Sequence, residues 1–207
     1  MLTELNKKNI NVEKLAKKAL KDKAVLSELL EGVLSKKERI RLNCFNVLLL
    51  ISEEHPKVLY PQWDFFVDLL TSPNTYFKYI AIYIIANLAK DDPKNRFEKI
   101  FNKYYALLDD ESVIPPAHVA SNSPKIAKAK PHLQIKITNR LLGIDKTHHK
   151  PERKDLIKSY VIEAFGELFE GARSKKKMFQ FVREQLQTKS LRTKKKAKEF
   201  LGKWDKE

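Results

Sequence analysis

The sequence predicts an all-α fold made of consecutive helix pairs. Two observations favour it: apolar residues recur at helical spacing through the 207 residues, and one helix pattern repeats at a nearly constant distance. Glycine, with 5 residues, is too scarce for a sheet rich in tight turns. No segment shows a convincing strand pattern. The chain therefore reads as helices throughout.

The helix expected over 77–89 carries one continuous apolar stripe. Its apolar residues follow the spacing i, i+3, i+4, i+7 that places side chains on one helix face. The helix expected over 40–51 has the same stripe. Both also carry apolar residues beside it, so we expect both to be buried on more than one side. The two stripes are Phe77, Ile80, Ala81, Ile84, Ile85, Leu88 and Ala89, and Ile40, Cys44, Val47, Leu48 and Ile51.

These two helices match each other at a constant offset of 37 residues. Each ends in an acidic cluster followed by proline, which cannot continue a helix. Later matches follow at an offset of 38, before Pro131, and at 42, where Gly171 supplies the stop. A period of 37 to 42 favours stacked helix pairs, and the alternative is an ordinary helical bundle with accidental spacing. The matched positions are Ile40, Arg41, Cys44, Leu48, Ile51 and Pro56 with Phe77, Lys78, Ala81, Ile85, Leu88 and Pro93.

Shorter amphipathic segments between these helices complete the pairs. We expect them near 63–70, 97–108, 133–141 and 178–186, after an earlier pair at about 12–20 and 24–34. Pro124, inside the third long helix, should kink or split it. The predicted organisation is one domain over 1–207, with units at about 12–35, 37–72, 74–110, 113–147 and 152–188 and a terminal helix at 191–204.

The repeated helix resembles the first helix of HEAT repeats, in the armadillo-type α-solenoid superfamily. A basic residue, a small residue three positions later and an acidic turn recur as Arg41, Cys44 and Glu53–Glu54, then as Lys78, Ala81 and Asp91–Asp92. The resemblance covers 12–204 and is strongest over 37–108. It implies a right-handed α-α superhelix of about five helix pairs, whose second helices line a partner-binding concave face. Most relatives are adaptors, not enzymes.

The positive charge is concentrated in the second half of the chain. The net charge is +15, and residues 111–207 hold 23 Lys and Arg against 11 Asp and Glu. Clusters at 125–154 and 173–198 would attract a polyanion such as a phosphate backbone. The alternative is a solvated surface that only aids solubility. The candidate groove residues are Lys128, Lys136, Arg140, Arg153, Lys176 and Arg183, of which Lys136 with Arg140, and Lys176 with Arg183, should share helix faces.

These observations predict a non-enzymatic scaffold that binds a macromolecule, with a protein partner first and nucleic acid as the alternative. HEAT-like DNA alkylation repair glycosylases are similar in size and charge, and their chemistry relies on aromatics and a carboxylate in the groove. Trp63 with Asp64 and Asp68 is the nearest counterpart. Trp63, however, lies on an apolar stripe, so we expect it in the core.

No catalytic residue, cofactor or metal site is expected. His148 and His149 with Glu152 look like a ligand cluster, but Pro151 interrupts any helix there, so we interpret them as a polar loop. Cys44 lies on a core stripe and should be an inert buried thiol. Paired carboxylates at 53–54, 91–92 and 109–110 recur at the repeat turns, which favours a helix-capping role over an active site.

The composition also gives an expectation for the cellular compartment of the protein. No stretch of 18 or more uncharged apolar residues exists, so no membrane-spanning helix is expected. The start of the chain has no apolar signal core, and the single cysteine cannot form an internal disulfide. Together these features predict a cytoplasmic protein.

Overall fold

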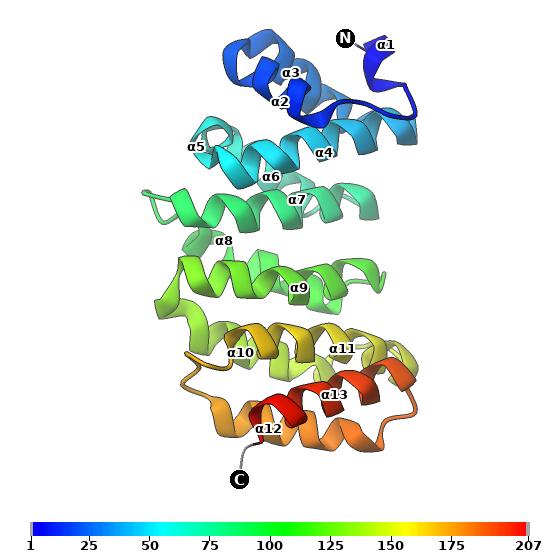
Figure 1. Ribbon diagram of the computed structural model, residues 1–207, viewed down its shortest axis with the longest axis vertical. Helices are drawn as coiled ribbons and strands as arrows, with labels where there is room; N and C mark the ends of the chain where they lie inside the picture. Colours follow the sequence, from blue (N-terminus) through cyan, green and yellow to red (C-terminus); the bar gives the residue numbers. More distant parts are fainter. Residues whose placement is uncertain (1, 206–207) are drawn as a thin grey trace. The chain divides into compact units, whose positions relative to one another are not determined.

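The computed structural model describes residues 2–205, with side chains described from Glu4 onward. This part of the chain consists of α-helices, short 3₁₀ turns and loops, and contains no strand (Figure 1). The predicted all-α class is therefore confirmed. The chain divides after Phe97 into two compact units, and each is described by itself.

The first unit holds the helices up to α7, and they agree with the segments expected there. A 3₁₀ turn over Tyr60–Gln62 joins α5 to α6, so the second part of this helix pair is broken into short pieces. The helices are α1 Leu2–Leu5, α2 Val12–Lys21, α3 Lys23–Gly32, α4 Glu38–Glu54, α5 Pro56–Leu59, α6 Trp63–Leu69 and α7 Thr75–Leu88.

Helix α4 is the centre of this unit. It packs against α2 and α3 and also against α7, as its two-sided apolar pattern predicts (Figure 1). Cys44, Leu48 and Ile51 are fully buried in these contacts. The N-terminal segment is tied to α4 because Asn43 Nδ2 donates to the carbonyls of Leu5 and Lys7, at 2.8 and 3.0 Å.

Asparagine and aspartate side chains fix where several helices begin. Asn11 Oδ1 accepts from the amide of Lys14 at 2.8 Å and caps α2, and Asn74 Oδ1 caps α7 through the amide of Tyr76 at 2.9 Å. Such caps satisfy amide groups that have no partner inside the helix. Helices α2 and α7 therefore start where the sequence supplies an acceptor.

Asp92 shows what the recurring acidic turns do. One carboxylate oxygen accepts from the amide of Arg96 at 2.9 Å and from the hydroxyl of Tyr60 at 2.7 Å, and the other accepts from the amide of Phe97 at 2.9 Å. The carboxylate thus caps the start of α8, Arg96–Ala106. Asp92 therefore agrees with the helix-turn role expected for this acidic pair.

Cys44 faces Gly32 at the contact of α3 with α4. A Cβ at position 32 would clash with Sγ of Cys44, so only glycine fits there. Burial raises the pKa of the Cys44 thiol to about 12. The group is therefore protonated at every physiological pH, and the predicted inert thiol agrees with its surroundings.

We expect Cys44 to resist alkylation in the folded protein. The thiolate is the reactive form, and a pKa near 12 leaves almost none of it at pH 8. Iodoacetamide at pH 8, followed by mass spectrometry, should modify the native chain far more slowly than the chain in denaturant. Equal rates in the two conditions would contradict the buried position.

The second unit begins within α8 and contains the remaining helices. They also match the segments expected from the sequence, with 3₁₀ turns at the ends of α8, α10 and α12. The helices are α9 Ile114–Ala129, α10 Gln134–Leu142, α11 Pro151–Leu168, α12 Lys175–Glu184 and α13 Leu191–Trp204.

The long helices of this unit lie side by side. Helix α11 packs against α9 and against α13, while α10 packs on α9 and α12 on α13 (Figure 1). Phe165 of α11 is fully buried, and its ring meets that of Phe181 of α12 edge-on, with centroids 5.6 Å apart. Both faces of α11 are therefore covered over most of its length.

Pro124 does not split its helix, so the split predicted as one of two outcomes is wrong. Helix α9 continues through it, and most of its residues around the proline are buried. Proline removes only the one backbone hydrogen bond that the carbonyl of Ala120 would accept, and three neighbouring side chains donate to other carbonyls of the same helix. These bonds join Ser121 to Ala117, Asn122 to His118 and Ser123 to Val119, at 3.0, 2.9 and 2.8 Å.

Within residues 2–205, none of the helices combines the length and the hydropathy needed to cross a membrane.

Candidate functional site

The two basic residues predicted on α10 share a face. The Lys136 ammonium lies 4.3 Å from the centre of the Phe101 ring, and Arg140 lies 5.9 Å from the same centre. Arg140 also donates to Asn102 Oδ1 at 2.8 Å. Both side chains are exposed, yet they cover a buried ring, so part of their role is packing.

Two other predicted residues are engaged by carboxylates. Arg183 of α12 bonds both oxygens of Asp205, at 2.8 and 3.0 Å, and Lys128 of α9 pairs with Glu167 of α11 at 3.2 Å. Lys176 and Arg153 are exposed and have no ion pair among the described residues. The positive charge of the predicted groove residues is thus partly neutralised by neighbouring acidic side chains.

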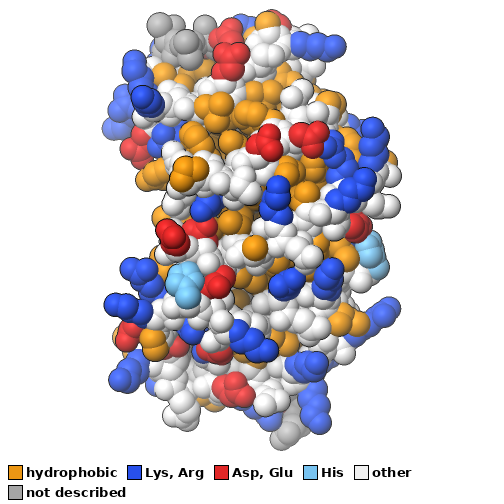
Figure 2. All heavy atoms as spheres, turned by 180° about the vertical axis from the view of Figure 1, so that it is seen from behind, with side chains coloured by type: hydrophobic (Ala, Val, Ile, Leu, Met, Phe, Trp, Pro, Cys, Tyr) orange, Lys and Arg blue, Asp and Glu red, His pale blue; other side chains and the backbone are white. Residues whose placement is uncertain are grey.

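The neighbouring Lys130 does not belong to the basic surface at all. Its side chain is buried and pairs with Glu98 at 3.0 Å, and His132 contacts the other oxygen of that carboxylate at 3.0 Å. Over the second unit, Figure 2 shows Lys and Arg side chains separated by acidic and uncharged ones instead of one continuous stripe.

A hollow of about 620 Å³ lies on the side of the long helices in the second unit. We call it the α11–α13 groove. Four glutamates and two lysines surround its apolar floor. Its lining is Ser121, Ile162, Glu163, Ala164, Gly166, Glu167, Glu170, Lys196, Glu199, Phe200, Lys203 and Trp204.

The groove offers both negative charge and an unused hydrogen-bond donor. Glu170 is exposed and has no ion pair among the described residues, whereas Glu163 and Glu199 both contact Lys196 at 3.0 Å. The indole nitrogen of Trp204 is buried without a hydrogen-bond partner. Buried indole N–H groups normally find an acceptor. This donor would gain one from a ligand in the groove.

Gly166 keeps the groove open. An added Cβ would meet only Phe200, at an ordinary contact distance of 3.9 Å. Glycine inside a helix costs about 1 kcal/mol relative to alanine. Gly166 thus lowers helix stability where no close packing requires it.

Replacing Gly166 by alanine should therefore stabilise the fold, by up to about 1 kcal/mol. The reason is the lower conformational freedom of the unfolded chain together with tolerated space in the folded one. Urea unfolding followed by circular dichroism measures the change. A loss of stability would mean that α11 and α13 approach more closely than described.

The first unit has a smaller hollow between α4 and α7. Its volume is about 60 Å³, and it is bordered by Leu42 and Tyr76, which are 52% and 54% exposed. The Arg41 guanidinium lies 4.7 Å from the centre of the Tyr76 ring. Exposed apolar side chains beside a hollow are typical of protein contact surfaces.

The residues considered for glycosylase chemistry do not form a groove. Trp63 is 1% exposed, so its ring offers no surface on which a base could stack. Asp64 is exposed and pairs with Arg96. The prediction that Trp63 belongs to the core is confirmed.

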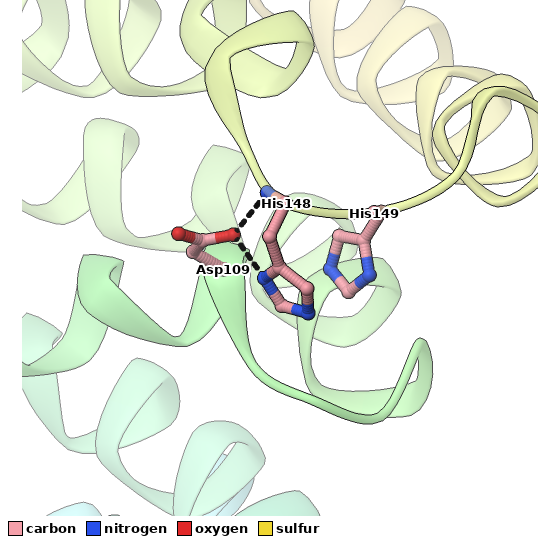
Figure 3. A group of neighbouring side chains, drawn as sticks. All are labelled: Asp109, His148 and His149. Carbon is pink, nitrogen blue, oxygen red and sulfur yellow. Dashed lines mark hydrogen bonds and ion pairs between the residues drawn. The ribbon is translucent and has the colours of Figure 1, made fainter.

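A three-residue cluster in the second unit was missed by sequence reasoning. The loop before α11 brings His148 and His149 to Asp109, at the end of the turn after α8 (Figure 3). Asp109 Oδ1 accepts from the backbone amide of His148 at 2.8 Å and lies 2.6 Å from its Nδ1. One donor atom from each residue lies within 4.8 Å of the others.

The surroundings favour the ionised form of Asp109 and the neutral form of His149. Hydrogen bonding from the His148 amide lowers the pKa of Asp109, which is therefore ionised. Burial lowers the pKa of His149, and the neighbouring His148 acts in the same direction. Neither ring nitrogen of His149 has a hydrogen-bond partner. A neutral imidazole beside a carboxylate is the form that binds metals.

The sequence indicates two of the three residues of this cluster. The sequence shows the pair His148–His149 and offers Glu152 as its third member. Pro151 begins α11, so the two histidines lie in the loop as expected, away from that helix face. Asp109 lies 39 residues before His148, and only the fold brings them together.

Comparisons with known proteins assign no family. No protein-family model matches the chain, and no curated protein matches it. Among solved structures, it is similar to the crystal structure of an engineered protein, a Northeast Structural Genomics Consortium target. The two are 16% identical over 97% of this chain and 94% of that one, with a TM-score of 0.42. A likeness this distant supports no statement about function.

Proposed function

We propose that the protein is a non-enzymatic scaffold that binds a protein segment bearing lysine or arginine in the α11–α13 groove. The scaffold would be a right-handed superhelix of about five HEAT-like helix pairs. Neighbouring long helices within each unit support that arrangement. The single cysteine is the reason to expect the cytoplasm as its compartment.

One observation carries the proposal: the groove is at once large, acidic at its rim and apolar at its floor. Its volume of about 620 Å³ suits a side chain with its flanking backbone. The part-exposed ring of Trp204 would contact the stem of a lysine or arginine. Glu170 would pair with the charged end.

The unpartnered indole N–H of Trp204 adds a specific contact. It would donate to a backbone carbonyl of the bound segment, which every peptide supplies. A nucleic acid would instead bring phosphates toward four glutamates and two lysines, and Glu170, which has no ion pair among the described residues, would repel them. The groove therefore favours a protein partner.

Two labelled peptides test this proposal, one carrying lysines and the other glutamates around the same apolar residues. Fluorescence anisotropy should show binding of the lysine peptide alone. Gly166→Tyr, which fills the groove, should remove it, and Glu170→Lys should weaken it. Binding of both peptides with equal affinity would contradict the proposal.

Matched controls separate the groove from general effects. Gly202→Tyr introduces the same side chain at a glycine of α13 with nothing within 4 Å of its Cβ, outside the groove lining. Glu111→Lys reverses an exposed charge elsewhere in the same unit. Neither variant should change the affinity for the lysine peptide.

Nucleic-acid binding remains a second candidate, supported by exposed lysines that have no acidic neighbour. Lys176, Lys177, Lys189 and Lys198 have no ion pair among the described residues. Lys175–Lys177 also occupy the first turn of α12, where the helix dipole disfavours positive charge. A bound phosphate would offset this repulsion.

A gel-shift assay with labelled DNA and RNA tests the second candidate. Affinity should fall steeply with added salt and disappear when Lys136, Arg140 and Arg183 are reversed to glutamate. Gly166→Tyr should leave it unchanged, because Gly166 lies on α11, whereas Lys136 and Arg140 lie on α10 and Arg183 lies on α12. No shift at low salt would exclude this function.

A further inference from the structure

The structure points to a second site, at Asp109, His148 and His149, that is independent of the proposed function. All three belong to the second unit, and Figure 3 shows both imidazole rings on the same side of the loop, next to the carboxylate. The rings lie against each other with centroids 4.4 Å apart. Two imidazoles and a carboxylate form a donor set suited to transition metals.

The buried side chain of His149 is the observation that indicates a ligand. Its side chain is 4% exposed, and both ring nitrogens are buried without a hydrogen-bond partner. The backbone of Leu108 lies near the ring and partly opposes the lowering of the His149 pKa by burial, but no contact of the ring nitrogens has the geometry of a hydrogen bond. A buried polar group left without a partner is destabilising, and native proteins rarely keep one.

We propose that Asp109, His148 and His149 bind a divalent transition-metal ion of the zinc class, each as a direct ligand. The ion would take the place of the hydrogen shared by Asp109 Oδ1 and His148 Nδ1, which are 2.6 Å apart. The ring then changes tautomer: the Nδ1 proton passes through water to Nε2, so that a neutral imidazole offers Nδ1 to the ion. A water molecule would complete a tetrahedral site.

Only small movements are needed to close the site. Bonds of about 2.0–2.1 Å place tetrahedral ligands about 3.4 Å from each other. The donor atoms already lie within 4.8 Å, and one pair is closer than the metal requires. The side chains of Asp109 and His148 are about half exposed, so both can turn toward an ion held by the buried His149.

The donor set also selects the ion. Calcium and magnesium prefer all-oxygen sites with more ligands than one carboxylate supplies. Imidazole nitrogen favours zinc, cobalt, nickel and copper. The backbone amide of His148, which donates to Asp109 Oδ1, would hold the carboxylate in place as a supporting contact.

Cobalt and zinc titrations of the full, untagged chain test the proposal. Co²⁺ should produce the visible absorption of a four-coordinate ion at one equivalent, and Zn²⁺ should displace it. His148→Ala and Asp109→Ala should each weaken binding at least tenfold. Both positions are exposed, so these variants should fold, which circular dichroism checks.

His132→Ala is the matched control. It removes another exposed histidine that contacts a carboxylate, Glu98, in the same unit. Its affinity for Co²⁺ and Zn²⁺ should equal that of the wild type. Absence of stoichiometric binding to the wild type would overturn the proposal, and so would an equal loss in His132→Ala and His148→Ala.

Discussion

Replacing Trp63 by alanine should lower the free energy of unfolding by about 3–5 kcal/mol, the range seen when large buried rings are removed. The ring is 1% exposed at the start of α6, which packs against α7. It contacts Tyr60, with ring centroids 5.8 Å apart, and the Arg96 guanidinium lies 5.6 Å from its centre. Urea unfolding followed by circular dichroism measures the loss.

Two further variants serve as comparisons for Trp63→Ala. Trp63→Phe keeps an aromatic ring in the same space and should cost less than alanine. Trp204→Ala removes the other tryptophan, which is only part-buried at the end of α13, and should also cost less. Unchanged stability in Trp63→Ala would show that the ring is not in the core.

Replacing Asp92 by alanine should cost about 2–4 kcal/mol. Loss of a helix cap alone costs about 1 kcal/mol, and buried donors left without an acceptor add to it. Asp92 accepts from the amides of Arg96 and Phe97 and from the hydroxyl of Tyr60, and it is only 8% exposed. The free energy of unfolding in urea gives the measurement.

The neighbouring Asp91 is the matched control. It belongs to the same acidic pair but is less buried and caps no helix among the described residues. Asp91→Ala should therefore change stability by less than about 0.5 kcal/mol. Equal losses for the two variants would mean that the charge of the pair matters, and not the hydrogen bonds of Asp92.

The helices could be predicted because their signals are local. The stripe over 77–89 places α7 to within two residues of its observed start. Pro56 and Pro151 could be recognised as helix boundaries for the same reason, since proline at the first helical position needs no amide partner. The split expected at Pro124 does not occur, because the burial of this helix outweighs the loss of one backbone hydrogen bond.

The sites could not be predicted because they depend on contacts between distant residues. Asp109 contacts His148, which lies 39 residues later, and the local sequence around either residue gives no indication of this contact. The sequence predicts Arg183 to be an unpaired charge, but its guanidinium bonds the carboxylate of Asp205, the residue that follows α13. The α11–α13 groove depends on Gly166 and on which face of α11 its neighbours leave open.

The prediction that second helices form the binding wall stays a prediction. Lys136 and Arg140 on α10 share a face, as that prediction requires, but they also cover Phe101. The α11–α13 groove instead lies beside two long helices, α11 and the terminal α13. The peptide and nucleic-acid experiments therefore examine two different surfaces of the second unit.

The two tryptophans allow the most direct measurement of the central claim. In an amide NMR spectrum of the ¹⁵N-labelled protein, each indole N–H gives its own signal. Adding the lysine peptide should shift the signal of Trp204, in the groove, and leave that of the buried Trp63 in place. If the Trp204 signal stays fixed while the peptide binds, the α11–α13 groove is not the docking site.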